Sequence, residues 1–108
     1  MYPHPIQLRE PWRRTGEADA PVLSRTFNAP TGLEPHEAVW LVIDRPSALA
    51  ELHFNGNLLG AAAPAVTSEF EITPHLANGN EIKLQFPPTK EPAEFASVRL
   101  EIRLKSKH

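Results

Sequence analysis

Apolar and polar residues alternate along much of this chain with the two-residue period of a β-strand. The clearest stretch is residues 96–104, where Val98, Leu100 and Ile102 alternate with charged side chains. Residues 38–44 are apolar on both faces, which is typical of a central strand covered on each side. Shorter strands are predicted at residues 6–10, 21–29, 48–55, 68–72 and 81–86.

A tight hairpin is predicted in the middle of the chain, at residues 52–60. Asn55 and Gly56 are residue types that adopt positive φ at both central positions of a type I′ turn, and apolar residues flank them at alternating places. Gly60 admits a close backbone approach on the returning strand.

Turn-forming residues separate the other strands, since the chain holds 12 prolines and 5 glycines. Thr73 and Pro74 predict an N-cap and the first position of one short helical turn near residues 74–77, anchored to the core by Leu76. Loops are expected at residues 11–20 and 87–95. About eight short strands and one helical turn predict an all-β antiparallel sandwich or jelly roll, as a single domain over residues 1–108 with a frayed tail at 104–108.

Composition excludes several classes of site and partner. The chain has no cysteine, so disulfides, thiolate zinc sites and cysteine nucleophiles are absent. A net charge of −2 gives no basic excess for nucleic acid or anionic membranes. No signal peptide or transmembrane segment is seen, so a cytoplasmic location is the default expectation.

The order of motifs resembles a known domain. The motifs are residues 25–30 (RTFNAP), the apolar strand at 39–43, the hairpin at 54–60 (FNGNLLG), residues 70–73 (FEIT) with Leu76, and residues 79–82 (GNEI). Over residues 20–86 they resemble the N-terminal sugar-binding domain of family 2 glycosidases, the β-galactosidase and β-glucuronidase type. The resemblance implies a galactose-binding-like jelly roll.

The same resemblance implies a domain without catalysis. Enzymes of that family carry their paired catalytic carboxylates on a separate barrel domain, and 108 residues leave no room for one. The chain also lacks the tryptophan- and glycine-containing segment that usually follows in the family. We therefore predict a non-catalytic module that recognises a glycan. The alternative is a structural or protein-interaction module that keeps the fold without a sugar site and binds a protein partner through a sheet face.

A sugar site needs an exposed aromatic face for stacking and polar side chains for the hydroxyl groups. If strands run up and down, four loops gather at one end of the sandwich, opposite the hairpin. The candidate ligand-binding residues on them are Trp12, Arg13, Arg14, Asp44, Arg45 and Lys90. The alternative is a structural role, in which Trp12 packs over the mouth of the sandwich and the arginines pair with Glu10, Glu17 or Asp19.

No cofactor is predicted. The five histidines have no ligand-like spacing, and Trp40 stands where a zinc-protease helix starting at His36 would need its second histidine. Only a structural calcium ion held by backbone carbonyls stays open.

Two further side-chain groups have predicted environments. Trp40 is expected in the core, and Arg25 is expected to pair with Asp44 or Glu10. The basic residues at the C-terminal end, with Arg9, predict either a charged protective sheet edge or a seam for an acidic partner.

Overall fold

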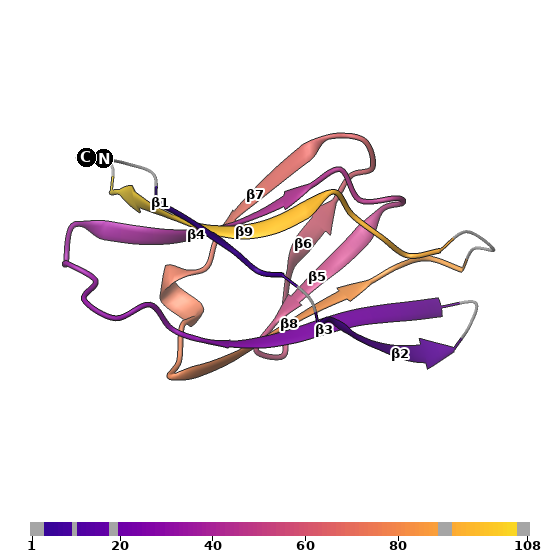
Figure 1. The fold of residues 1–108 in the computed structure, drawn as a ribbon, viewed down its shortest axis with the longest axis horizontal. Coiled ribbons are helices and arrows are strands. Elements are labelled where there is room, and N and C mark those ends of the chain that lie inside the picture. Colours follow the sequence, from indigo (N-terminus) through magenta and orange to yellow (C-terminus); the bar gives the residue numbers. More distant parts are fainter. Residues whose placement is uncertain (1–3, 10, 18–19, 89–91, 106–108) are drawn as a thin grey trace.

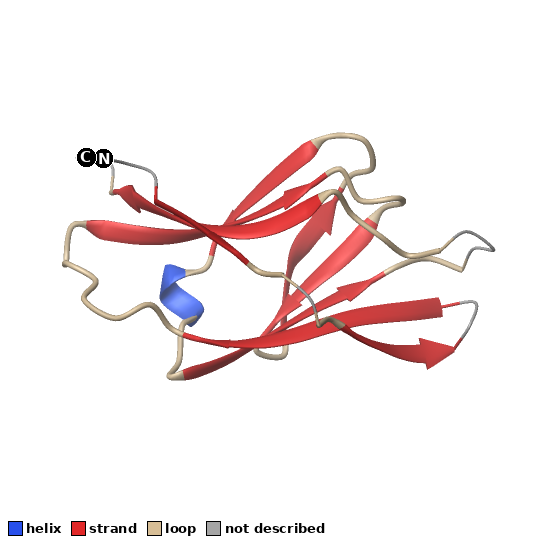
Figure 2. Ribbon diagram, in the orientation of Figure 1, coloured by secondary structure: helices blue, strands red, loops and turns tan. Residues whose placement is uncertain are grey.

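Two antiparallel sheets face each other in the computed structural model, which describes residues 4–9, 11–17, 20–88 and 92–105 (Figure 1). Sheet A has the order β1 (His4–Gln7), β9 (Ser97–Leu104), β4 (Glu37–Asp44), β7 (Thr67–Glu71). Sheet B has the order β2 (Arg13–Glu17), β3 (Ala20–Asn28), β8 (Gly79–Gln85), β5 (Ala50–Phe54), β6 (Asn57–Ala62). Nearly all of the described chain is strand or loop, which confirms the predicted β-sandwich (Figure 2).

The core lies between the sheets and follows the alternation of apolar residues. In β4 the side chains of Val39, Leu41 and Ile43 are fully buried in it. Leu52 and Phe54 of β5 and the β8 residues that pair with them come from the opposite sheet. Burying such side chains contributes about 1.5–3 kcal/mol each, so this alternating pattern is what holds the two sheets together.

Strand β2 corrects the predicted loop at residues 11–20. Residues 13–17 pair with β3, from Arg13 opposite Ser24 to Glu17 opposite Ala20. This segment has no apolar alternation because it forms the edge of sheet B, where an exposed strand needs only backbone pairing. The described residues therefore hold nine strands, one more than predicted.

The hairpin at residues 52–60 forms as predicted. Asn55 has φ 51° and Gly56 has φ 85°, the positive values that a type I′ turn requires, and the turn joins β5 to β6. Gly60 has φ 152°, and a Cβ atom there would stand 3.0 Å from the Phe70 ring. The expected close approach at Gly60 is thus a contact between the two sheets.

A single 3₁₀ turn, η1 (Thr73–His75), connects β7 to β8, close to the predicted position. Leu76 packs on the core as expected. Thr73 is not the N-cap, however, because that position belongs to Ile72 and carries no side-chain cap. The Thr73 hydroxyl instead accepts a hydrogen bond from the Val39 backbone N–H at 2.8 Å, which ties the turn to β4.

Candidate functional site

Trp12 is buried, which corrects the expectation of an exposed stacking face. Only 9% of the residue is exposed. Its indole Nε1 donates to the Leu8 carbonyl at 3.0 Å, and its ring meets the Phe95 ring edge-on at 5.1 Å between centroids. The indole of Trp12 thus packs on the core, and no open ring face is left to stack on a sugar.

Three of the four predicted loops do meet at one end of the sandwich. The Arg45 backbone N–H donates to the Val66 carbonyl at 2.9 Å, and the Ser47 backbone N–H donates to the Glu94 carbonyl at 2.8 Å. These bonds join the β4–β5, β6–β7 and β8–β9 connections (Figure 1). Lys90 falls in the last of them but lies outside the described residues.

Asp44 and Arg45 interact with each other at this end. The Thr67 hydroxyl donates to Asp44 at 2.8 Å, and this hydrogen bond lowers the pKa of the Asp44 carboxyl below its usual value, helped by the neighbouring Arg45 guanidinium. Arg45 Nε lies 3.3 Å from the same carboxylate. The pair is exposed, so it contributes little to stability.

Arg13 and Arg14 point to opposite faces of sheet B. Arg14 pairs with Leu23, whose side chain is in the core, whereas Arg13 pairs with Ser24. Successive residues of a strand alternate between its two faces, so Arg13 and Ser24 share the outer face. The two arginines, grouped together by sequence, therefore belong to different surfaces.

A polar hollow of about 430 Å³ opens beside Arg13, where β2 begins and β3 loses its neighbour on that side. We call it the Ser24 hollow. The side chains around it come from β2, β3, β8 and the segment before β2. The residues that matter for its chemistry are Trp12, Arg13, Ser24, Arg25, Thr26 and Glu81.

Ser24 is the unusual member of this group. The residue is only 7% exposed, yet its hydroxyl makes no hydrogen bond to any other residue that the structure describes. The hydroxyl itself stays open to solvent, since the one fully buried side-chain atom without a partner among the described residues is His53 Nε2. The hydroxyl lines the hollow, so a bound molecule or water can supply the missing bond.

Arg25 also departs from its predicted pairing. Its Nε donates to the Arg9 carbonyl at 2.8 Å and its Nη1 donates to the Thr26 carbonyl at 3.1 Å. Asp44 is not its partner, and Glu10 lies outside the described residues. Two backbone carbonyls therefore hold the guanidinium in place without neutralising its charge.

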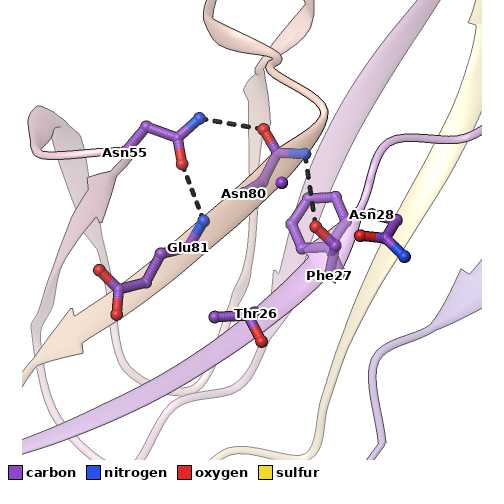
Figure 3. Close-up of a pocket in the computed structure, with 7 residues that line it drawn as sticks. Thr26, Phe27, Asn28, Asn55, Asn80 and Glu81 are labelled. Atoms are coloured by element: carbon purple, nitrogen blue, oxygen red, sulfur yellow. Dashed lines mark hydrogen bonds between the residues drawn. The ribbon is translucent and has the colours of Figure 1, made fainter.

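A second hollow, of about 470 Å³, lies near the turn of the β5–β6 hairpin and is shown in Figure 3. The side chains of Asn55 and Asn80 meet there at 3.0 Å, and Asn55 Oδ1 accepts from the Glu81 backbone N–H at 2.8 Å. Asn80 also bonds both backbone groups of Ala77. Since these amides are satisfied within the fold, their role here is structural.

The outer face of sheet A is covered by its own charged side chains. Trp40 is half-buried on this face, with the Arg103 guanidinium carbon 4.9 Å from the centre of its ring. The prediction that Trp40 lies in the core is therefore wrong. Side chains along β4 alternate between its two faces. Because both faces carry apolar residues, the sequence does not indicate which face lies toward the core. Glu101 binds both Arg99 and Arg103, at 2.7 and 2.6 Å.

In the predicted basic seam, the two arginines of β9 pair with carboxylates, whereas Arg9 and Lys105 form no ion pair with a described residue. Arg103 also binds Glu69 at 3.0 Å, which links β9 to β7 across β4. The basic residues of β9 do not form a sheet edge, since β9 lies between β1, the edge strand, and β4. The first and last strands, β1 and β9, pair with each other.

We expect the stability of the protein to depend on the ionisation of Glu101. Burial alone would raise the pKa of its carboxyl, but hydrogen bonds from Arg103 and Arg99 outweigh burial, and the pKa falls below the usual 4.5. A lowered pKa contributes stability that is complete above the unfolded value and is lost as the pH falls through the folded value. The free energy of unfolding, measured with urea from about pH 6 downward, should fall less steeply with acid for Glu101→Gln than for the parent. Parallel curves for the two proteins would contradict this assignment.

The described residues offer no cluster of three or more His, Asp or Glu side chains that could hold a metal ion. Among the same residues, no helix is long and apolar enough to cross a membrane.

No protein-family model matches the chain, and no curated protein matches it. Solved structures do. A β-glucuronidase from Bacteroides uniformis matches over 93% of this chain with 16% identity and a TM-score of 0.73, and one from Dictyoglomus thermophilum matches over 96% with 13% identity and a TM-score of 0.73. The β-glucuronidase of Bifidobacterium dentium, complexed with coumarin-3-O-glucuronide, is 27% identical over 63% of this chain, with a TM-score of 0.57.

These matches confirm the predicted resemblance to family 2 glycosidases and the galactose-binding-like fold. The chain spans 11% of the length of the Bifidobacterium protein, 18% of the Bacteroides protein and 28% of the Dictyoglomus protein. It thus corresponds to a small part of each larger glycosidase.

Proposed function

We propose that this protein is a non-catalytic module that recognises a glycan through the Ser24 hollow. The observation that carries the proposal is the Ser24 hydroxyl, which bonds no other described residue and lines an open polar hollow. Such a group gains a hydrogen bond when a polyhydroxylated ligand enters, because sugar hydroxyls both donate and accept.

The surroundings of Ser24 fit a sugar better than an apolar ligand. Thr26 adds a second hydroxyl, Glu81 adds acceptor oxygens, and Trp12 forms part of the wall. The structural resemblance to glycosidases supports a glycan as the ligand class. In this proposal Trp12 acts as a wall and not as a stacking platform.

The wider loop end is a weaker candidate for the same role. Asp44 and Arg45 bond each other there, and Arg14 lies on the core-side face of sheet B. A sugar site built on these residues would need the exposed pair to separate. We therefore place the glycan at the Ser24 hollow and use Arg45→Gln as a test of the loop end.

The alternative function, a protein-interaction module acting through a sheet face, has less to support it. On the outer face of sheet A, Glu69 and Glu101 already pair with the arginines of β9, and Arg103 covers Trp40. A partner docking there would have to displace these contacts. A stable complex that is lost on Trp40→Ala would favour this alternative over glycan binding.

Binding to a glycan array, followed by calorimetry on the best ligand, tests the proposed function. We expect Ser24→Ala to weaken binding by roughly fivefold, the effect of about 1 kcal/mol for one neutral hydrogen bond. Ser68→Ala on β7 of sheet A is the matched control and should leave binding unchanged. If no glycan binds, or if Arg45→Gln weakens binding and Ser24→Ala does not, the Ser24 hollow is the wrong site.

A further inference from the structure

Two arginines, Arg13 and Arg25, line the Ser24 hollow together with one carboxylate, that of Glu81. Within the part of the chain that the structure describes, neither Arg13 nor Arg25 forms an ion pair. Arg45, Arg99 and Arg103 each bind a carboxylate. The two guanidiniums at the hollow therefore differ from the arginines that support the fold.

Arg25 is also held in advance of any binding. Its Nε and Nη1 atoms are occupied by the carbonyls of Arg9 and Thr26, while Nη2 donates to no described residue. A guanidinium fixed in this way loses little conformational entropy when it binds an anion. Ser24, the residue before Arg25 on β3, pairs with Arg13 across the strands.

The remaining side chains limit what kind of anion fits. Glu81 lines the same hollow, and its carboxylate lies 3.8 Å from Lys83 on the same strand. A carboxylate there repels a ligand with many closely spaced negative charges, such as a chain of phosphates, more strongly than a ligand with one charge. It also accepts hydrogen bonds from sugar hydroxyls. The hollow thus has both cationic donors and acceptors for hydroxyls in its lining.

We propose that the glycan bound at the Ser24 hollow is acidic, and that Arg13 and Arg25 bind its carboxylate or sulfate group. This inference rests on the proposed function and names the ligand class of the same site. Arginine forks bind such planar or tetrahedral anions through paired hydrogen bonds that are about twice as strong as neutral ones. Ser24 and Thr26 then bind the hydroxyls of the same sugar.

The test compares three oligosaccharides of equal length by calorimetry on the full chain: a galacturonate oligosaccharide, a sulfated oligosaccharide and a neutral glucose oligosaccharide. We expect at least one charged ligand to bind about tenfold or more tightly than the neutral one. This preference should shrink as salt is raised, since screening weakens exposed charge pairs. The two charged ligands separate a carboxylate site from a sulfate site.

Two variants one residue apart locate the charge effect. Arg13→Gln should remove most of the preference for the charged ligand, while Arg14→Gln, with the same charge change on the opposite face of β2, should keep it. Arg25→Lys keeps the charge but loses the paired donors, and should weaken charged-ligand binding if its unfolding curve matches the parent. Arg13→Gln remains decisive if Arg25→Lys does not fold.

The outcomes separate the two proposals. Equal binding of neutral and charged oligosaccharides, or equal losses for Arg13→Gln and Arg14→Gln, overturns the acidic-ligand inference and leaves glycan recognition standing. Failure of all three oligosaccharides and of the glycan array overturns both proposals. Binding of a phosphopeptide or nucleic acid in their place also overturns both.

Discussion

Replacing Trp12 with alanine is expected to lower the free energy of unfolding by about 3–5 kcal/mol, the usual cost of removing a buried tryptophan. The variant loses the contact with Phe95 and the hydrogen bond to the Leu8 carbonyl, and it leaves a cavity at the edge of the core. Urea unfolding followed by circular dichroism measures the loss independently of tryptophan fluorescence.

Trp40→Ala is the matched control for this prediction. Trp40 is half-buried on the outer face of sheet A and contacts Arg103. We expect a smaller loss, of about 1–2 kcal/mol, from partial burial and the cation–π contact. A cost below about 1 kcal/mol for Trp12→Ala, combined with lost glycan binding, would show instead that Trp12 is exposed in solution and contacts the sugar directly.

Asn80→Ala is expected to destabilise the protein by about 3 kcal/mol, because it leaves several polar groups without hydrogen-bond partners at once. Asn80 is 3% exposed, and its amide bonds the Ala77 N–H, the Ala77 carbonyl and the Asn55 side chain. These bonds hold the chain after η1 against the β5–β6 hairpin. The loss should appear as a lower urea midpoint with an unchanged slope.

Asn28→Ala provides the control, since Asn28 is exposed and lines the same hollow (Figure 3). Its side chain bonds no other described residue. We expect a change within about 0.5 kcal/mol. If the two asparagine variants were equally stable, the Asn55–Asn80 contacts would not support the fold, and this second hollow would need a ligand-based explanation.

The strands that line the core could be predicted because the residues of most of these strands alternate between apolar and polar. Residues 98–102 alternate strictly, and Asn55-Gly56 has few conformations other than a tight turn, so β9 and the hairpin follow from their own residues. Strand β2 could not be predicted in this way. It lies at an edge and is stabilised by backbone pairing with β3, which leaves no apolar signature.

The site was predictable only in part, because burial of Trp12 depends on a residue far along the chain. Pro11, Arg13 and Arg14 surround the indole with polar sequence, whereas the ring that covers it belongs to Phe95. Ser24 gave no signal of its own. The useful sign was Arg25, a charged residue at an apolar position of its strand, and it does line the hollow.

The position of β9 between β1 and β4 has a consequence for how the chain becomes a folded protein. Strands β1 and β4 do not pair with each other, so sheet A has no continuous backbone ladder until residues 97–104 are in place. On the ribosome these residues are made after every other described strand. Pairings between distant segments also slow folding, because the loop must close before any contact forms. Sheet A is therefore completed only after β9 has been synthesised, whereas the five strands of sheet B pair without it.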